Sequence, residues 1–363
     1  MTSTERFVAA LQHRTPDRIP RCDYFLDSFP DAWRRYKGLG SAADPMDYYG
    51  IDITEMVGNE EFMPSQARRL AADGDSETWA DGWGMIKRVY KRETYFNHQV
   101  GAVLEDPAAL DRLQFDAVTE PSRFASLPQQ LERHRRVGRF VMAKSGGIYI
   151  RSHFLRGEPA LLTDMALDPG FCAALFDKVA DHLERMSIET LRRTGSMANG
   201  LLVCDDMAGN RGPMFSPGMF DRFFAPRYQR MIQNLKAAGC QHVYFHSDGN
   251  IMPIMDSLVA VGFEGFNPLE PRCGMDVVQL RERYGRKILL MGGVCNTRIL
   301  PHGSKRQIEA HVRPLLELGR EGGLVLGAAS ISGDIAPAAY DYYHSLCQRY
   351  GRYMSESDGV DAD

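Results

Sequence analysis

From about residue 200 onward, short apolar runs that end in polar residues alternate with longer segments that repeat apolar residues at helical spacing. Between the runs, a segment such as 219–239 places Met231, Ile232 and Leu235 on one helical face. This alternation is typical of successive βα units. Five runs are predicted strands: 200–206, 242–248, 263–270, 287–296 and 323–330.

Three earlier runs extend the pattern to eight predicted strands: 17–24, 50–56 and 139–145. The runs are almost entirely apolar instead of alternating, as expected for parallel strands that are buried on both faces. Eight βα units predict an α/β protein with a closed (β/α)8 TIM barrel. The alternative is an open doubly wound sheet, but no glycine-rich phosphate-binding motif opens any of the predicted helices.

The segment 57–138 is too long for one crossover between strands. Inside it, the stretch 77–98 is rich in aromatic and β-branched residues, which favour antiparallel strands. We therefore expect an insertion after the second strand that forms a lid over the barrel mouth. The barrel is predicted to be a single domain over 1–352, followed by a flexible acidic tail at 353–363.

Composition narrows the class of protein. The chain has 363 residues, 44% of them hydrophobic, and a net charge of −4, so it can bury a large core and has no basic excess that would attract nucleic acid. No run reaches about 18 uninterrupted apolar residues, and the first residues lack the pattern of a secretion signal. The seven cysteines are scattered and never form a C-x-x-C pair, which favours reduced thiols. These features predict a cytoplasmic protein without a membrane segment.

Polar side chains follow nearly every predicted strand, where TIM barrels carry their catalytic groups. Asp205 and Asp206 are adjacent on a strand and cannot both point inward, so at most one is catalytic. A histidine with carboxylates could bind a metal or transfer protons, or it could only satisfy backbone groups at the strand ends. The polar residues at or after strand ends are Asn59, Glu60, Lys144, His153, Asp205, Asp206, His246, Asp248, Asn267, Glu270, Cys295, Asn296 and Ser330.

A family resemblance covers nearly the whole chain. The stretches "TPDRIP", "DYYGIDI", "DDMAGNRGPMFSPGMFDRFFAPRY", "HSDGN", "GRKILLMGGVCNTRILPHGS" and "GGLVLGAAS" occur in an order and spacing that resemble the uroporphyrinogen decarboxylase superfamily, which also contains corrinoid-dependent methyltransferases. The resemblance implies a (β/α)8 barrel. It also implies a substrate that is carboxylated or carries a transferable methyl group.

The resemblance departs from classical uroporphyrinogen decarboxylases at their substrate-binding positions. Where those enzymes carry an arginine-containing motif, this chain has "CDYFLDSF" at 22–29. Their essential aspartate falls on Asn59, their substrate-contacting tyrosine falls near His153, and their late histidine is replaced by Ala328. Without cationic groups for the substrate carboxylates, classical uroporphyrinogen decarboxylation is not expected.

The methyltransferase branch carries a zinc site made of a histidine, a cysteine two residues later and a distant second cysteine. His246 matches the histidine, whereas Asp248 replaces the first cysteine and Ser330 lies near the place of the second. Zinc could still bind through His246, Asp248 and either Glu270 or Cys295, in a harder site suited to polarising an oxygen.

We therefore predict a corrinoid-linked methyltransferase that demethylates a small methylated substrate. The rival hypotheses are a decarboxylase of a small carboxylated molecule and a non-catalytic barrel that binds a corrinoid or tetrapyrrole. The chain has no D-x-H-x-x-G cobalamin motif, so a corrinoid would be supplied by a partner protein. The sequence does not determine the oligomeric state, and a homodimer is one option. Predicted catalytic residues are His153, Asp205, Glu270 and Asn59; predicted substrate-binding residues are Asn267, Tyr149 and Ser330; predicted metal ligands are His246, Asp248 and Cys295.

Overall fold

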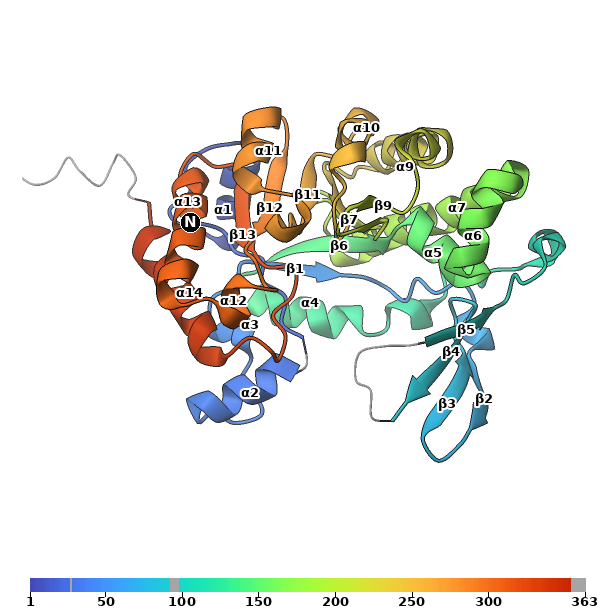
Figure 1. The fold of residues 1–363 in the computed structure, drawn as a ribbon, viewed down its shortest axis with the longest axis horizontal. Coiled ribbons are helices and arrows are strands. Elements are labelled where there is room, and N and C mark those ends of the chain that lie inside the picture. The colour runs from blue at the N-terminus through green and yellow to red at the C-terminus, as the bar shows by residue number, and fades with distance from the viewer. Residues whose placement is uncertain (27, 92–97, 354–363) are drawn as a thin grey trace, which may run out of the picture.

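The computed structural model describes residues 1–26, 28–91 and 98–353. Seven parallel strands form one curled sheet in the order β1-β6-β7-β10-β11-β12-β13 (Figure 1). Seven of the eight predicted strand regions thus supply a strand, and their order along the sheet follows their order along the chain. The strands are β1 Ile53–Met56, β6 Phe140–Gly146, β7 Leu201–Cys204, β10 Val243–His246, β11 Gly265–Asn267, β12 Leu289–Gly293 and β13 Leu324–Gly327.

The predicted first strand at 17–24 is not a regular strand, although it lies between the two edges of the sheet. Leu326 of β13 donates its N–H to the Pro20 carbonyl at 2.9 Å and accepts from the Cys22 N–H at 3.0 Å. The Arg21 carbonyl in turn accepts from Asp52 N–H at 3.1 Å, directly before β1. Pro20 has no N–H to donate, so this segment cannot form a continuous ladder.

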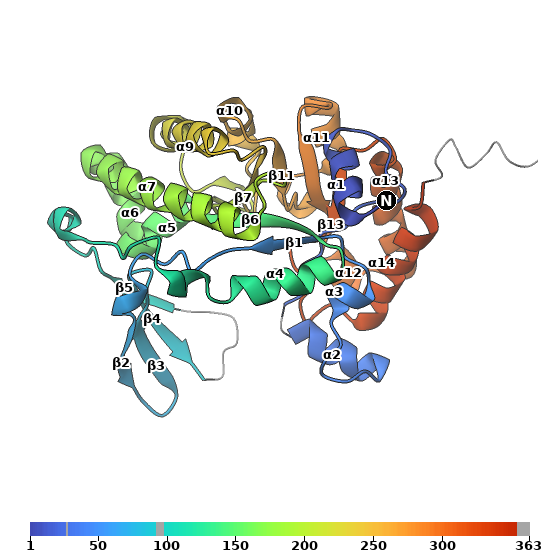
Figure 2. The same ribbon diagram turned by 180° about the vertical axis from the view of Figure 1, so that it is seen from behind.

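Helices cover the outside of the sheet in the views of Figures 1 and 2. The helix α13 begins with a capping box, in which Gln307 N–H donates to Ser304 Oγ and Ser304 N–H donates back to Gln307 Oε1. Among the described residues, no helix is both long and apolar enough to cross a membrane. The helices are α1 Ser3–Leu11, α2 Ser28–Lys37, α3 Pro45–Tyr48, α4 Leu127–Arg136, α5 Ile148–Arg156, α6 Glu158–Leu167, α7 Pro169–Thr194, α8 Pro217–Met219, α9 Ala225–Ala237, α10 Met255–Val261, α11 Val277–Tyr284, α12 Ile299–His302, α13 Lys305–Gly319 and α14 Pro337–Tyr350.

The inner face of the sheet is apolar toward the amino ends of the strands. There α1 packs against the sheet, and its Phe7 ring stacks on Phe140 with centroids 4.0 Å apart. Several strands contribute one or two further residues each to this buried cluster, namely Ile53, Met142, Leu202, Tyr244, Leu289, Met291 and Val325. Because side chains alternate along a strand, residues two positions further on face the same interior, closer to the carboxyl ends.

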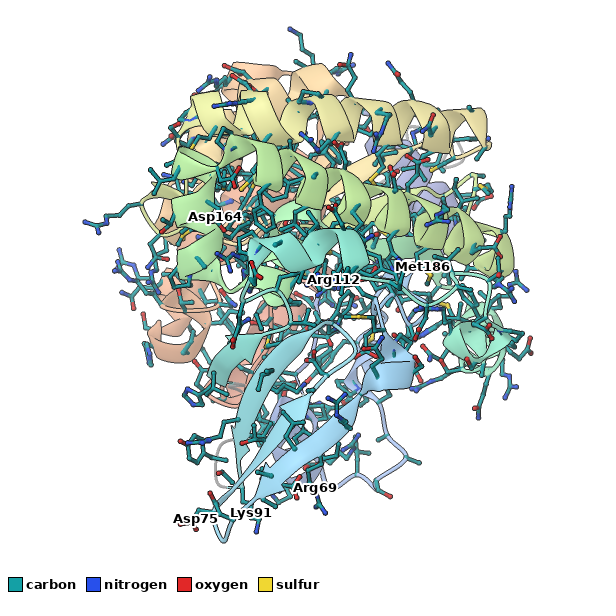
Figure 3. All side chains as sticks on the ribbon, turned by 90° about the vertical axis from the view of Figure 1, so that its right-hand side faces the viewer. Arg69, Asp75, Lys91, Arg112, Asp164 and Met186 are labelled. Carbon is teal, nitrogen blue, oxygen red and sulfur yellow. The ribbon has the colours of Figure 1, made fainter. Side chains whose placement is uncertain are left out.

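A second sheet lies between β1 and β6 in the sequence. It is antiparallel, with the strand order β2-β3-β4-β5, and Figure 3 shows Asp75 and Lys91 at its tip, away from the helices. Its role as a lid over the barrel mouth remains a prediction, as does the single domain over 1–352. Within the predicted tail, residues 354–363 lie outside the described residues. The strands are β2 Arg68–Ala72, β3 Ser76–Ala80, β4 Met85–Tyr90 and β5 His98–Ala102, and a short hairpin is formed by β8 Ala208–Gly209 and β9 Gly212–Pro213.

Asp205, directly after β7, holds the start of α5. Its carboxylate accepts hydrogen bonds from Tyr149 N–H at 3.0 Å, Ile150 N–H at 2.7 Å and the Tyr228 hydroxyl at 2.5 Å. Gly147 permits this approach, because a Cβ there would lie 1.9 Å from the Asp205 side chain. Burial raises the pKa of Asp205 to about 6, although the three donated hydrogen bonds oppose the rise.

Substitution of Phe7 tests whether α1 is needed to complete the apolar interior. We expect Phe7→Ala to lower the free energy of unfolding by about 3–5 kcal/mol, because it leaves a cavity in a packed core. Urea denaturation measures this change, with the exposed Thr4→Ala on the same helix as a control. A loss below about 1 kcal/mol would show that α1 is not part of the core.

Substitution of Asp205 tests its role in holding α5. Asparagine replaces one acceptor oxygen with an NH2 donor, so Asp205→Asn leaves a buried donor unpaired and should cost about 1–3 kcal/mol in the free energy of unfolding. The next residue, Asp206, has a half-exposed side chain, so Asp206→Asn should change the free energy of unfolding by no more than about 0.5 kcal/mol. Equal effects of the two substitutions on the urea midpoint would contradict this assignment.

Candidate functional site

A cavity of about 360 Å³ opens inside the curled sheet, on the side of the carboxyl ends of the strands. This is the end at which TIM barrels place their reactive groups. Polar members of its wall come from different strands, so residues far apart in the sequence face one space. The lining residues are Cys22, Tyr24, Leu26, Ile53, Glu55, Met142, Lys144, Leu202, His246, Asp248, Asn267, Met291, Ala328, Ala329 and Ser330.

Three side chains form a cluster that could hold a metal ion, and two of them, His246 and Asp248, line this cavity. Asp206, His246 and Asp248 each offer one ligand atom, and these atoms lie within 4.8 Å of one another. His246 Nε2 is 3.7 Å from Asp206 Oδ1 and 3.8 Å from Asp248 Oδ1. The side chains of Asp206 and Asp248 are 43% and 57% exposed, so water or a substrate can reach the cluster.

The imidazole of His246 is oriented by Asn267. His246 Nδ1 lies 2.6 Å from Asn267 Oδ1, and the Asn267 amide nitrogen donates to the Met291 carbonyl at 3.3 Å. Because an amide oxygen only accepts hydrogen bonds, Nδ1 is the donor to Asn267, and Nε2 is the ring nitrogen that faces the two carboxylates. A second partner of this kind is a common feature of metal-binding histidines.

The loop after β10 is shaped so that both carboxylates face His246. Asp248 N–H donates to Asp206 Oδ1 at 3.0 Å, and Gly249 N–H donates to Glu270 Oε2 at 2.9 Å. Gly249 has a φ of +81°, and a Cβ at this position would lie 2.4 Å from the Ala208 carbonyl oxygen. Only glycine fits such a close backbone approach in this conformation.

The electrostatics of the cluster favour a positively charged partner. Partial desolvation at the cavity wall raises the pKa of Asp248 to about 6; His246 opposes the rise, and the charges of Asp206 and Glu270 add to it. A bound cation would relieve this repulsion between carboxylates. The same group could also give up a proton near neutral pH.

A second charged pair lies at the cavity wall, on β1 and β6. Lys144 Nζ is 3.0 Å from Glu55 Oε2, and the two side chains are 36% and 33% exposed. Glu55 follows Ile53 and Lys144 follows Met142 at a spacing of two, so both continue the inward-facing rows of the apolar cluster.

The other predicted substrate and catalytic residues are distributed as follows. Ser330 lines the cavity, and its Oγ accepts from the Asn296 amide at 3.2 Å. Tyr149 is buried and donates its hydroxyl to Glu158 Oε1 at 2.8 Å. His153 Nδ1 lies 3.9 Å from the same Glu158 oxygen, and His153 lines a separate open cavity of about 630 Å³ beside α5 and α6.

Three further predicted residues lie outside the cavity wall. Asn59 is exposed, and its side chain bonds to Glu61. Glu270 accepts hydrogen bonds from Gly249 N–H, in the loop after β10, and from the thiol of Cys273, three residues further along the chain. Cys295 is buried, its Sγ lies 3.8 Å from Thr297 Oγ1, and it is not part of the three-residue cluster.

The sequence predicted Asp205 as a catalytic residue, whereas the structure places its neighbour Asp206 next to His246. The sequence also did not predict Glu55, which lines the cavity. The alternation of side chains along β7 carries the missing signal. Leu202 faces the cavity, and Asp206 shares its parity, whereas Asp205 has the opposite parity and turns toward α5.

Comparison with solved structures identifies the fold. A methyltransferase from Methanosarcina mazei has a TM-score of 0.62 at 16% identity, over 96% of this chain and 99% of that chain. An endo-1,4-beta-xylanase from Penicillium canescens scores 0.41 at 11% identity, covering 70% and 93% of the two chains. A B12-independent methionine synthase from Shewanella sp. W3-18-1 scores 0.40 at 10% identity, covering 92% and 95%. At 16% identity, the similarity to the methyltransferase shows a shared fold.

No curated protein matches this sequence. The family model for uroporphyrinogen decarboxylase matches residues 148–339, which is more than half of the chain. That range contains β7, β10, β11, β12 and β13, together with all three residues of the candidate metal cluster. The chain therefore belongs to the uroporphyrinogen decarboxylase family.

Proposed function

We propose that this protein is an enzyme that removes a methyl group from a small substrate and uses a divalent cation held by Asp206, His246 and Asp248. The observation that carries the proposal is the convergence of these three ligand atoms within 4.8 Å at the wall of the cavity. The fold similarity to a methyltransferase is consistent with it. The corrinoid that accepts the methyl group would be supplied by a partner protein. We also propose that the barrel is eight-stranded, with residues 17–24 as its irregular strand.

The donor set suits zinc or a harder divalent cation. One imidazole nitrogen and two carboxylate oxygens are three protein ligands, which is the number typical of catalytic zinc sites with an open fourth position. The exposure of both carboxylates leaves room for that position. We propose Asp206 as the third ligand in place of Cys295, because Asp206 faces His246 directly.

The size and charge of the cavity favour a small substrate over a tetrapyrrole. A volume of about 360 Å³ is near the lower end of the range for small-molecule pockets. Lys144 is the one lysine or arginine among the described lining residues, and Glu55 already pairs with it. A substrate with many carboxylates would meet a single lysine and no arginine in this wall, too few cationic partners for its charges.

The proposed chemistry assigns a task to each residue of the cluster. When bound, the cation would polarise the substrate oxygen that leaves. The methyl carbon would pass to the nucleophilic acceptor, while the oxygen keeps the electron pair and gains a proton. Asp206 and Asp248 neutralise the cation, Asn267 fixes the imidazole of His246, and Glu270 positions the Asp248 loop through Gly249 N–H.

A second candidate function is decarboxylation of a small carboxylic acid. The observation that favours it is the pKa of Asp248, raised to about 6, which makes this side chain a proton donor near neutral pH. In that reaction the carbon dioxide leaves the electron pair on carbon, and Asp248 protonates the carbanion.

Metal analysis tests the cluster directly. We expect about one divalent metal ion per chain in protein purified without chelators, and loss of it in His246→Ala and Asp248→Asn, because each removes one of three ligands. Inductively coupled plasma mass spectrometry measures the content. Asp31→Asn, which removes an exposed carboxylate on α2, is the matched control and should keep the metal. Folded wild-type protein without stoichiometric metal would contradict the metal site.

An activity assay separates the candidate functions. Methyl transfer predicts that reduced cobalamin, or a corrinoid protein, becomes methylated in the presence of a methylated substrate, as followed by its absorption spectrum. Decarboxylation predicts carbon dioxide release without any corrinoid. Tight corrinoid binding that His246→Ala leaves unchanged, with neither product formed, would favour the non-catalytic barrel.

A further inference from the structure

The Glu55–Lys144 pair is not required to hold β1 and β6 together. The two strands already share a parallel backbone ladder that pairs Ile53 through Met56 with Phe140 through Ala143. A partly exposed ion pair contributes only about 0–1 kcal/mol to stability. With side chains that are 36% and 33% exposed, the pair is also not a buried contact that closes the core. The pair therefore has no evident role in the fold and faces the space where a substrate would bind.

The charges around the cavity limit which ligands it can accept. Glu55 and Asp248 in the wall and Asp206 beside it supply three negative charges, and Lys144 supplies one positive charge, so these four ionised groups carry a net charge of −2. A divalent cation at the cluster brings this sum to zero. A ligand without net charge then adds no uncompensated charge to a partly desolvated space.

Two opposite charges 3.0 Å apart also select against a ligand with a single charge. An anion that approaches Lys144 is repelled by Glu55, and a cation that approaches Glu55 is repelled by Lys144. A ligand that carries both charges pairs with both residues at once. Lys144 has three donor hydrogens, of which the Glu55 contact uses one, so donors remain for a ligand carboxylate.

We propose that Glu55 and Lys144 form a recognition site for the two charged groups of a small zwitterion, such as an amino acid whose side chain carries the transferable methyl group as an ether. The carboxylate of the ligand pairs with Lys144 and its ammonium group pairs with Glu55. This inference deepens the proposed function, on which it rests for the fate of the methyl group, and it names the substrate class.

Three isosteric probes test the proposal on the metal-loaded protein. N,N-dimethylglycine is a zwitterion, 3-methylbutanoate is the same shape without the positive charge, and N,N-dimethylglycinamide at pH 7 lacks the negative charge. Isothermal titration calorimetry should show that wild-type protein binds the zwitterion about tenfold or more tightly than either isostere, as expected for one lost charge-assisted hydrogen bond.

Two variants assign the contacts. Glu55→Gln should bind dimethylglycine no more tightly than 3-methylbutanoate. Lys144→Met should bind dimethylglycine no more tightly than dimethylglycinamide. The double variant Glu55→Lys with Lys144→Glu keeps the pair with its charges reversed, so it should keep the zwitterion preference and controls for folding. Equal binding of the zwitterion and either isostere by wild type, or no binding of dimethylglycine, would overturn the proposal.

The outcome is separable from that of the proposed methyl transfer. His246→Ala should lose the metal and any methyl transfer but keep the preference for the zwitterion, because Glu55 and Lys144 lie on other strands. Glu55→Gln and Lys144→Met should keep the metal content of wild type. A preference for the zwitterion without methyl transfer would support only the recognition site. Methyl transfer without a preference for the zwitterion would support only the proposed reaction.

Discussion

The parallel backbone ladder from β1 to β13 is the constraint on which the rest of the structure depends. It fixes which side chains face the interior, because residues alternate between the two faces of each strand. Toward the amino ends the interior row is apolar, with Met142 and Leu202 packed under Phe7 of α1. Two residues further along each strand, Lys144 follows Met142 and His246 follows Tyr244 at the cavity wall, so one geometric rule produces both the core and the polar wall.

Gathering like charges at the cavity raises the electrostatic free energy of the folded protein. This unfavourable energy is the physical argument that the polar wall has a function. The carboxylates of Glu55 and Asp248 line the cavity with one lysine among the described lining residues, and Asp206 adds a third carboxylate beside Asp248. Repulsion of this kind is visible in the raised pKa of Asp248, to which Asp206 and Glu270 add after the loss of water. A cation and a ligand of matching charge would remove the repulsion, which connects the proposed metal site to the proposed substrate class.

Buried charges away from the cavity serve the fold instead. Asp52 accepts hydrogen bonds from Arg6 and Arg18 and from the Arg21 N–H, and it thereby ties the chain start to the segment before β1. Asp205 accepts hydrogen bonds from the N–H groups of Tyr149 and Ile150 and thereby holds the start of α5. These carboxylates are fully partnered by donors, whereas the side chain of Asp248 remains more than half exposed at the cavity. The number of donors around a carboxylate thus separates the structural aspartates from the candidate site.

The sequence by itself determined the order of seven strands, the helix cap at Ser304 and the position of His246 and Asp248 at a strand end. These features follow from local periodicity and from residue types that act over a few positions. The tertiary structure alone decided that Pro20–Cys22 joins both edges of the sheet. Alternation along β7 separates Asp205 from Asp206, but only the tertiary structure decided which of the two faces His246. It also decided that Glu55 meets Lys144 from a strand far away in the sequence. Such pairings depend on register between strands and on the direction in which each side chain points, and neither quantity is encoded by spacing along the chain alone.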